Sequence, residues 1–225
     1  MHTTYDIYQL EVGFFNMFNF NYIIVDKASR QAAIVDPAWN EDVIIRTFDE
    51  LGIQPKLILL THSHIDHINL VPRLVERFHS RVCMSAQEIN FYHFHSDNLS
   101  PLHDLEKLHL GETQITCLLT PGHTVGSTCF LLANSLFTGD TIFTEGCGIC
   151  TQPGGSPEQM FESVQRIKNL VQPHIHIYPG HTYGKKPGQT LDFLLHNNIY
   201  FQFEKKDQFV RFRMRKHQKN IYHMW

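Results

Sequence analysis

The chain has 225 residues, of which 42% are hydrophobic and 18% are charged, a balance typical of folded proteins rather than disordered ones. Its formal net charge is −3, but residues 204–225 hold seven Lys or Arg against two acids, so the remaining residues carry −8. An acidic body of this kind would repel a phosphate backbone, which argues against nucleic acid as a partner.

The first ten residues predict no export signal, because they include Asp6 and neither Lys nor Arg. Near the front of the chain, the longest aliphatic run is Leu57–Leu60, far short of the roughly 20 residues that span a membrane. Five scattered cysteines are therefore expected to be reduced thiols. These features predict a cytoplasmic protein with no membrane partner.

Short apolar runs between polar or turn residues predict strands, and apolar residues at helical spacing predict helices. The first half predicts strands at Ile7–Val12, Tyr22–Val25, Ala32–Val35, Leu57–Leu60 and Val82–Met84, with a helix at Glu41–Leu51 and an amphipathic segment at Leu70–Phe78. The second half predicts strands at Ile115–Leu119, Thr128–Leu132, Leu136–Thr138 and Ile175–Tyr178, with a helix at Glu158–Leu170 that follows Pro157. Strands alternating with helices predict a layered α/β or mixed architecture.

The basic segment 204–225 is expected to be a short appendage of a single domain that spans residues 1–225. Alternation from Val210 to Arg215 fits a strand with one basic edge, but the spacing of the apolar residues also allows a short helix. A solvated charged face is one interpretation. The other is a docking patch for an acidic partner such as an acyl-carrier protein.

The chain contains 16 histidines. They are densest directly after the predicted strand Leu57–Leu60. The run Thr61-His62-Ser63-His64-Ile65-Asp66-His67 places three His and one Asp within six positions. Neutral imidazoles and carboxylates are ligands that Zn²⁺ or iron accepts. One zinc takes about four ligands, so a second metal would need ligands from elsewhere.

Three further candidates each follow a strand-like run and a glycine: His123 in TPGHT, Asp140 in FTGDT and His181 in PGHT. Glycine lets the backbone come close to a crowded centre. Taken singly, each residue is more often a surface or capping residue. Together with the first cluster they supply five His and two Asp, enough for two metals that share a carboxylate. Asp36 allows two interpretations, a partner that orients a ligand histidine or a turn-forming Asp-Pro.

The motifs HxHxDH, PGHT, FTGD and PGH resemble those of the metallo-β-lactamase superfamily over residues 5–185. The resemblance implies an α/β (α+β) fold, a four-layer αββα sandwich with the metal site at one edge of the paired sheets. It also implies the ligands: His62, His64 and His123 for the first metal, Asp66, His67 and His181 for the second, and Asp140 between the two.

Within the superfamily, FTGDTIFTEGCG at residues 137–148 resembles hydroxyacylglutathione hydrolases (glyoxalase II), as does Tyr183, two positions after His181. After GCG that family has a basic residue and then aromatics, where Ile149-Cys150-Thr151 stand here. Only 44 residues follow His181, so the long C-terminal helical domain of that family is not expected here. The segments GHTYGKKPGQT and NNIYF, with the Phe/Arg/Lys-rich end, resemble the zinc hydrolases of bacterial polyketide synthase gene clusters.

These resemblances imply a dinuclear zinc hydrolase that cleaves an acyl thioester by a metal-bound hydroxide. Asp66 would orient the hydroxide, and Tyr183 would donate to the oxyanion. The thioester would be carried by an acyl-carrier protein or coenzyme A, and iron or manganese is not excluded as the metal. Two alternatives stay open: a hydroxyacylglutathione hydrolase, and a mononuclear iron oxidoreductase of the persulfide dioxygenase type, in which the FTGD…GCG stretch also occurs.

Overall fold

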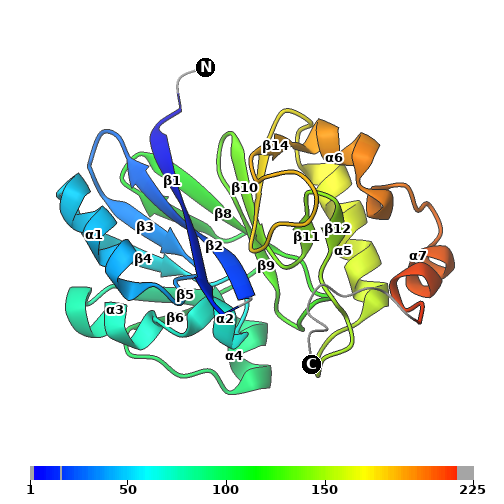
Figure 1. Ribbon diagram of the computed structural model, residues 1–225, viewed down its shortest axis with the longest axis horizontal. Helices are drawn as coiled ribbons and strands as arrows, with labels where there is room; N and C mark the ends of the chain where they lie inside the picture. Colours follow the sequence, from blue (N-terminus) through cyan, green and yellow to red (C-terminus); the bar gives the residue numbers. More distant parts are fainter. Residues whose placement is uncertain (1–2, 16, 217–225) are drawn as a thin grey trace.

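Two six-stranded β-sheets face each other in the computed structural model, and helices cover the outer face of each sheet (Figure 1). The structure describes residues 3–15 and 17–216. The first sheet has the order β1 (Tyr5–Phe14), β2 (Met17–Asp26), β3 (Ala32–Val35), β4 (Pro55–Leu59), β5 (Arg81–Ser85) and β6 (Leu99–Leu102). The second has the order β14 (Gln189–Thr190), β13 (His176–Pro179), β10 (Ser135–Gly139), β9 (Thr128–Leu131), β8 (Thr113–Leu119) and β7 (Lys107–Leu110). A small hairpin joins β11 (Ile142–Phe143) to β12 (Gly146–Cys147).

The helices divide between the two outer layers (Figure 1). The first sheet is covered by α1 (Glu41–Leu51) and α3 (Val71–Phe78), and the second by α5 (Pro157–Leu170), α6 (Leu191–Asn197) and α7 (Lys206–Arg213). Shorter elements are α2 (Ile65–Ile68), α4 (Ala86–Tyr92) and the 3-10 helix η1 (Ile199–Phe201). Of the helices in residues 3–15 and 17–216, none is long and apolar enough to cross a membrane.

Three apolar cores separate the four layers. Ile44 and Phe48 of α1 pack on the outer face of the first sheet, in one core. Phe130 and Phe137 of the second sheet lie in the core between the sheets, and Val164 of α5 lies in the third core. Burying apolar area on both faces of both sheets is the main stabilising term of such a sandwich. The layer order αββα is the one that the resemblance to the metallo-β-lactamase superfamily implies.

Most predicted elements are present with small differences in length. Ala32–Val35 and Glu41–Leu51 begin and end as predicted. Gly52 ends α1 in the left-handed conformation, with φ of 62°, and its N–H donates to the last turn. The sequence analysis does not predict the short elements α2, α4, α6, η1, β6, β7, β11, β12 and β14. Each has two to seven residues, too few for a clear hydrophobic period.

The basic C-terminal segment forms a helix, α7, rather than a strand. Phe209 is fully buried, and its ring lies 5.5 Å from that of Phe161 on α5 and 5.3 Å from that of Tyr200. This packing joins α7 to the outer layer of the second sheet. Residues 217–225 lie outside the described residues, so the appendage at 204–225 stays a prediction.

Candidate metal centre

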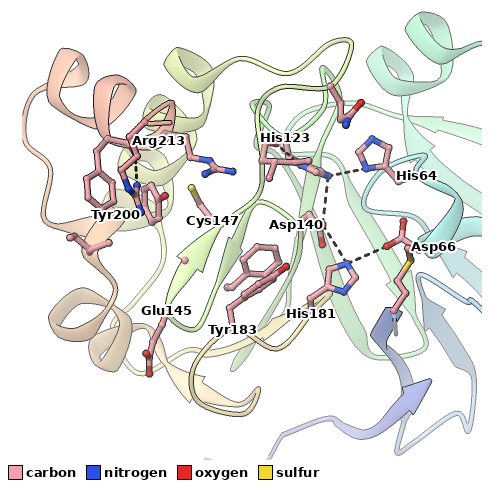
Figure 2. Close-up of a pocket in the computed structure, with 18 of the residues that line it drawn as sticks. His64, Asp66, His123, Asp140, Glu145, Cys147, His181, Tyr183, Tyr200 and Arg213 are labelled. Atoms are coloured by element: carbon pink, nitrogen blue, oxygen red, sulfur yellow. Dashed lines mark hydrogen bonds and ion pairs between the residues drawn. The ribbon is translucent and has the colours of Figure 1, made fainter. Parts of the chain in front are cut away.

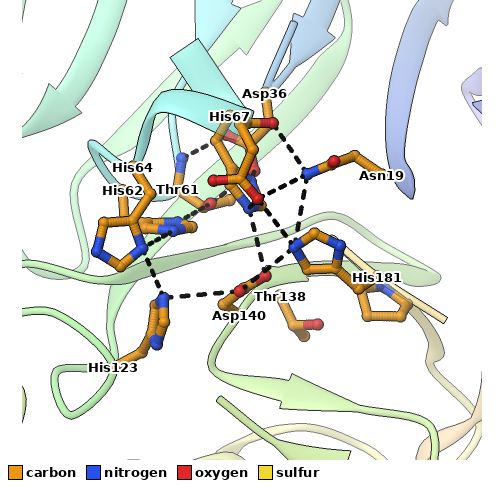
Figure 3. Close-up of polar contacts among 12 residues, drawn as sticks. Asn19, Asp36, Thr61, His62, His64, His67, His123, Thr138, Asp140 and His181 are labelled. Atoms are coloured by element: carbon orange, nitrogen blue, oxygen red, sulfur yellow. Dashed lines mark hydrogen bonds and ion pairs between the residues drawn. The ribbon is translucent and has the colours of Figure 1, made fainter. Parts of the chain in front are cut away.

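The seven side chains predicted to bind metal meet at one edge of the paired sheets (Figures 2 and 3). The loop after β4 and the short α2 bring four of them, and loops after β8, β10 and β13 bring one each. Ligand-type atoms lie within 4.8 Å of one another in a first group, His62, His64 and His123, and in a second group, Asp66, His67 and His181.

Asp140 lies between the two groups (Figure 3). Its Oδ2 is 3.6 Å from His123 Nε2 and 3.5 Å from His181 Nε2. Its Oδ1 is 3.4 Å from His67 Nε2. One carboxylate therefore contacts both groups, which is the position that the sequence resemblance implies for a shared ligand.

Backbone carbonyls hold two of the histidine rings from outside the centre. His123 Nδ1 lies 2.7 Å from the carbonyl oxygen of Ile149, and His181 Nδ1 lies 2.7 Å from that of Phe18. A carbonyl oxygen can only accept, so each Nδ1 carries the donated proton. In the neutral ring, the Nε2 atom then keeps its lone pair and faces the centre.

Asp36, directly after β3, orients two more rings. Its Oδ2 accepts from His67 Nδ1 at 3.0 Å and from Thr61 Oγ1 at 2.6 Å. Because Thr61 donates its hydroxyl proton to Asp36, its Oγ1 atom accepts a hydrogen bond from His62 Nδ1, at 3.1 Å. Of the two interpretations of Asp36, the geometry supports the partner that orients a ligand-type histidine.

The centre contains buried polar atoms that protein atoms do not satisfy. Among the described residues, His67 Nε2 and Asp140 Oδ1 are buried without a hydrogen-bond partner. In the first group the ring nitrogens crowd together, since His64 Nδ1 lies 3.1 Å from His62 Nε2 and 2.9 Å from His123 Nε2. Buried polar atoms without a partner cost free energy. Cations would satisfy them, and this set of imidazoles and carboxylates fits Zn²⁺.

The two groups differ in charge. Burial lowers the pKa of His123 to about 4 and the pKa of His62 well below its ordinary value, so both rings are neutral. In the second group burial opposes both charges, but the opposite charges of the neighbours dominate. They hold the pKa of Asp66 well below its ordinary value and raise the pKa of His67 to about 10. A metal ion bound there would replace the proton on His67.

Asn19, on β2, contacts the centre although the sequence analysis does not predict it. Its Nδ2 donates to Asp66, at 2.9 Å from the backbone oxygen and 3.2 Å from Oδ2. Trp39 Nε1 donates to Asn19 Oδ1 at 2.8 Å. These bonds fix the orientation of the Asp66 carboxylate.

A pocket of about 580 Å³ opens over the two groups (Figure 2). On one side are His64, Asp66 and His181, and on the opposite side are Tyr200 and Arg213 of the C-terminal elements. Phe212 and Arg215 also line the pocket. Tyr183, predicted to donate to an oxyanion, also lines the pocket, and its ring lies 4.5 Å from that of Phe143. The pocket therefore joins the candidate metal centre to the basic end of the chain.

Arg213, at the end of α7, reaches the pocket from a buried position. Its Nε donates to the carbonyl oxygen of Gly148 at 2.8 Å, next to the residue whose carbonyl accepts from His123. The interpretation of this segment as a solvated charged face is therefore wrong for Arg213. It is right for Arg211, which is 73% exposed and pairs with Asp207.

Cys147 and Cys150 have the spacing Cys-x-x-Cys, which the sequence analysis overlooks. All five cysteines are free and buried, as expected for reduced thiols. Burial raises the pKa of Cys147 well above its ordinary value and that of Cys150 to about 11. Neither thiol is therefore expected to ionise near neutral pH or to act as a nucleophile.

Comparison with known proteins agrees with this geometry. A family model described as "Metallo-beta-lactamase superfamily" matches residues 18–181. The "Probable polyketide biosynthesis zinc-dependent hydrolase PksB" of Bacillus subtilis is 49% identical over 222 residues, which cover 99% of each chain. A "Hydroxyacylglutathione hydrolase" of an Enterobacter species is 34% identical over 154 residues, 68% of this chain and 58% of that protein. The crystal structure of ETHE1 from Myxococcus xanthus has a TM-score of 0.84 at 24% identity, covering 95% of this chain and 92% of that chain, so the two share a fold.

Proposed function

Since the chain belongs to the metallo-beta-lactamase superfamily, we propose that it is a zinc-dependent hydrolase of acyl thioesters that acts in polyketide biosynthesis. The name of the Bacillus subtilis relative supports the zinc, the hydrolytic reaction and the pathway. The observation that carries the proposal is the pair of ligand groups that Asp140 joins at the floor of the pocket. The thioester and the use of two metal ions are the finer parts of the proposal.

In this proposal His62, His64 and His123 hold one zinc ion, Asp66, His67 and His181 hold the second, and Asp140 contacts both. Bound zinc acidifies water and polarises a carbonyl oxygen, which are the two requirements of thioester hydrolysis. The unpartnered atoms His67 Nε2 and Asp140 Oδ1 support this assignment, because zinc would replace the His67 proton and give both atoms a partner.

Two side chains around the pocket would act on the substrate directly. The Asp66 carboxylate stays ionised and is fixed by Asn19, so it can accept a hydrogen bond from the attacking water and orient it. Tyr183 lines the same pocket, and its hydroxyl can donate to the oxygen on which negative charge develops. The departing sulfur would lie on the side of the pocket toward the C-terminal elements.

The basic side of the pocket supports a thiol carrier that bears a phosphate. Arg213 and Arg215 line it, and the Arg215 guanidinium lies over the Phe212 ring, with Cζ 3.7 Å from the ring centroid. Guanidinium groups suit phosphate recognition. Coenzyme A and the prosthetic arm of an acyl-carrier protein both place a phosphate at a distance from the thioester, so either carrier fits a pocket with metal ligands on one side and arginines on the other.

Substituting Arg215 by Gln is expected to raise KM for a coenzyme A thioester about fivefold, because one exposed charge contributes up to about 1 kcal/mol. The increase should shrink at high salt, since mobile ions screen an exposed charge. Arg211→Gln is the matched control, because Arg211 lies four residues before Arg215, is exposed and does not line the pocket. Equal KM values for the two variants would contradict the proposal that Arg215 recognises a phosphate of the thiol carrier.

The direct test is a panel of thioesters with one acyl group on coenzyme A, acyl-carrier protein and glutathione, assayed with the zinc-loaded enzyme. The proposal predicts that the coenzyme A or carrier-protein thioester is hydrolysed fastest. Preference for glutathione would favour the hydroxyacylglutathione hydrolase alternative, which the 34% identity of the Enterobacter protein supports. Failure to hydrolyse any thioester, with oxygen consumed by an iron-loaded enzyme, would favour the oxidoreductase alternative.

A further inference from the structure

Glu88 is a buried carboxylate beside the candidate metal centre, although it belongs to neither ligand group. It lies in the short α4 and has no exposed surface. The Ser85 hydroxyl caps this helix by accepting from the Glu88 backbone N–H at 3.1 Å. The side chain therefore projects from a fixed position, and its charge needs partners because burial removes it from water.

Four neutral donors satisfy the Glu88 carboxylate. Oε1 accepts from the Ser63 N–H at 2.8 Å and from the Ser63 hydroxyl at 2.7 Å. Oε2 accepts from the Thr124 hydroxyl at 2.8 Å and from the Gly126 N–H at 2.9 Å. Each carboxylate oxygen therefore binds a different loop, with one backbone and one hydroxyl donor in each.

These two loops carry the whole first group. Ser63 stands between His62 and His64, and Thr124 directly follows His123. The loops come from different sheets, since the first follows β4 and the second follows β8. Glu88 thus links the two parts of the chain whose separation decides whether the three imidazoles meet at one point.

We propose that Glu88 is a positioning residue that fixes the distance between these loops and so preorganises His62, His64 and His123 for a metal ion. The inference rests on the proposed function in taking that ion to be zinc. Glu88 touches none of the imidazoles in the described contacts, so it acts through the loops.

Substitution of Glu88 by Gln separates this role from simple space filling. The amide keeps the size of the side chain but presents one oxygen and one NH₂ group. A hydroxyl can rotate to accept from the NH₂ group, but the backbone N–H of Ser63 or Gly126 that faces it cannot. Glu88→Gln therefore leaves one backbone N–H without its acceptor and weakens the link to that loop, while the other loop keeps both of its hydrogen bonds.

The experiment measures zinc affinity by competition with a chromophoric chelator, alongside the midpoint of thermal unfolding. Glu88→Gln should weaken zinc binding at the first group about 10- to 100-fold, the range typical for residues that orient metal ligands. Thr124→Val, which removes a single donor, should weaken it several-fold and serves if Glu88→Gln does not fold.

Asp26→Asn is the matched control. Asp26 is equally buried and also accepts four hydrogen bonds, two from Ser29, one from the Glu112 N–H and one from the Thr113 hydroxyl. None of these donors is next to a residue of the candidate centre. This variant should lower the unfolding midpoint and leave zinc affinity unchanged.

The outcomes separate the inference from the proposed function. Wild-type zinc affinity in Glu88→Gln and Thr124→Val, with a lower unfolding midpoint, would show that Glu88 only stabilises the fold and would overturn the inference. Equal loss of zinc affinity in Asp26→Asn would do the same. If the wild-type protein itself bound no zinc, the proposed function would fail and this inference with it.

Discussion

Asp140→Ala is expected to lower thioester turnover more than about 100-fold and to reduce bound zinc below two ions per chain. The Asp140 carboxylate contacts His123 of the first group and both His67 and His181 of the second. Residues that only orient a ligand cost about 10- to 100-fold when they are lost, so the loss of a shared ligand should exceed that range. Initial rates and zinc content, measured on the same preparation, check the prediction.

Asp192→Ala is the control for this variant, because Asp192 is exposed on α6 and its nearest ionic contact is His196, at 3.8 Å. It should retain both zinc and turnover. If Asp140→Ala kept wild-type turnover, the proposed sharing of this carboxylate between two metal ions would be wrong.

Gly180→Ala should abolish zinc binding at the second group, with a loss of turnover again above about 100-fold. A Cβ at Gly180 would lie 2.6 Å from His67 Cε1 and 2.7 Å from Asp140 Oδ1, closer than real Cβ contacts allow. One methyl group would therefore push apart two of the proposed ligands. The same overpacking should also destabilise the fold by about 1–3 kcal/mol, partly offset because alanine reduces the entropy of the unfolded chain.

Gly52→Ala is the control for the added methyl group. Gly52 has φ of 62° and open space where a Cβ would be, so alanine there should cost about 1 kcal/mol of backbone strain and leave zinc binding intact. Zinc content should thus fall in Gly180→Ala alone, although each substitution lowers the thermal midpoint. Full zinc content in Gly180→Ala would contradict the assigned positions of His67 and Asp140.

The sequence predicts the convergence of the ligand-type residues because each motif follows a strand. Strands of a sandwich end at a common edge, so residues after β4, β8, β10 and β13 can meet there. Asp36 belongs to the same class, since it directly follows β3. The positions at strand ends, together with the ligand chemistry of the residues, were sufficient to predict that the four motifs meet, although they are separated in the sequence.

Other contacts of the centre could not be predicted from the sequence. Asn19 lies within a strand, and Glu88 lies in a helix too short to show a period. Arg213 belongs to a basic segment whose other arginines, Arg211 and Arg215, are exposed, so composition does not separate it from them. These residues reach the site through tertiary packing, and their roles depend on which neighbours the fold brings to them.

The central claim is that two zinc ions, held by the two groups and Asp140, are required for hydrolysis. The most direct measurement removes metal with a chelator and then adds zinc stepwise, recording bound zinc and thioester hydrolysis in the same samples. The account predicts no turnover in the metal-free protein and full turnover only as binding approaches two ions per chain. Full turnover without metal, or turnover that is complete at one ion per chain, would contradict it.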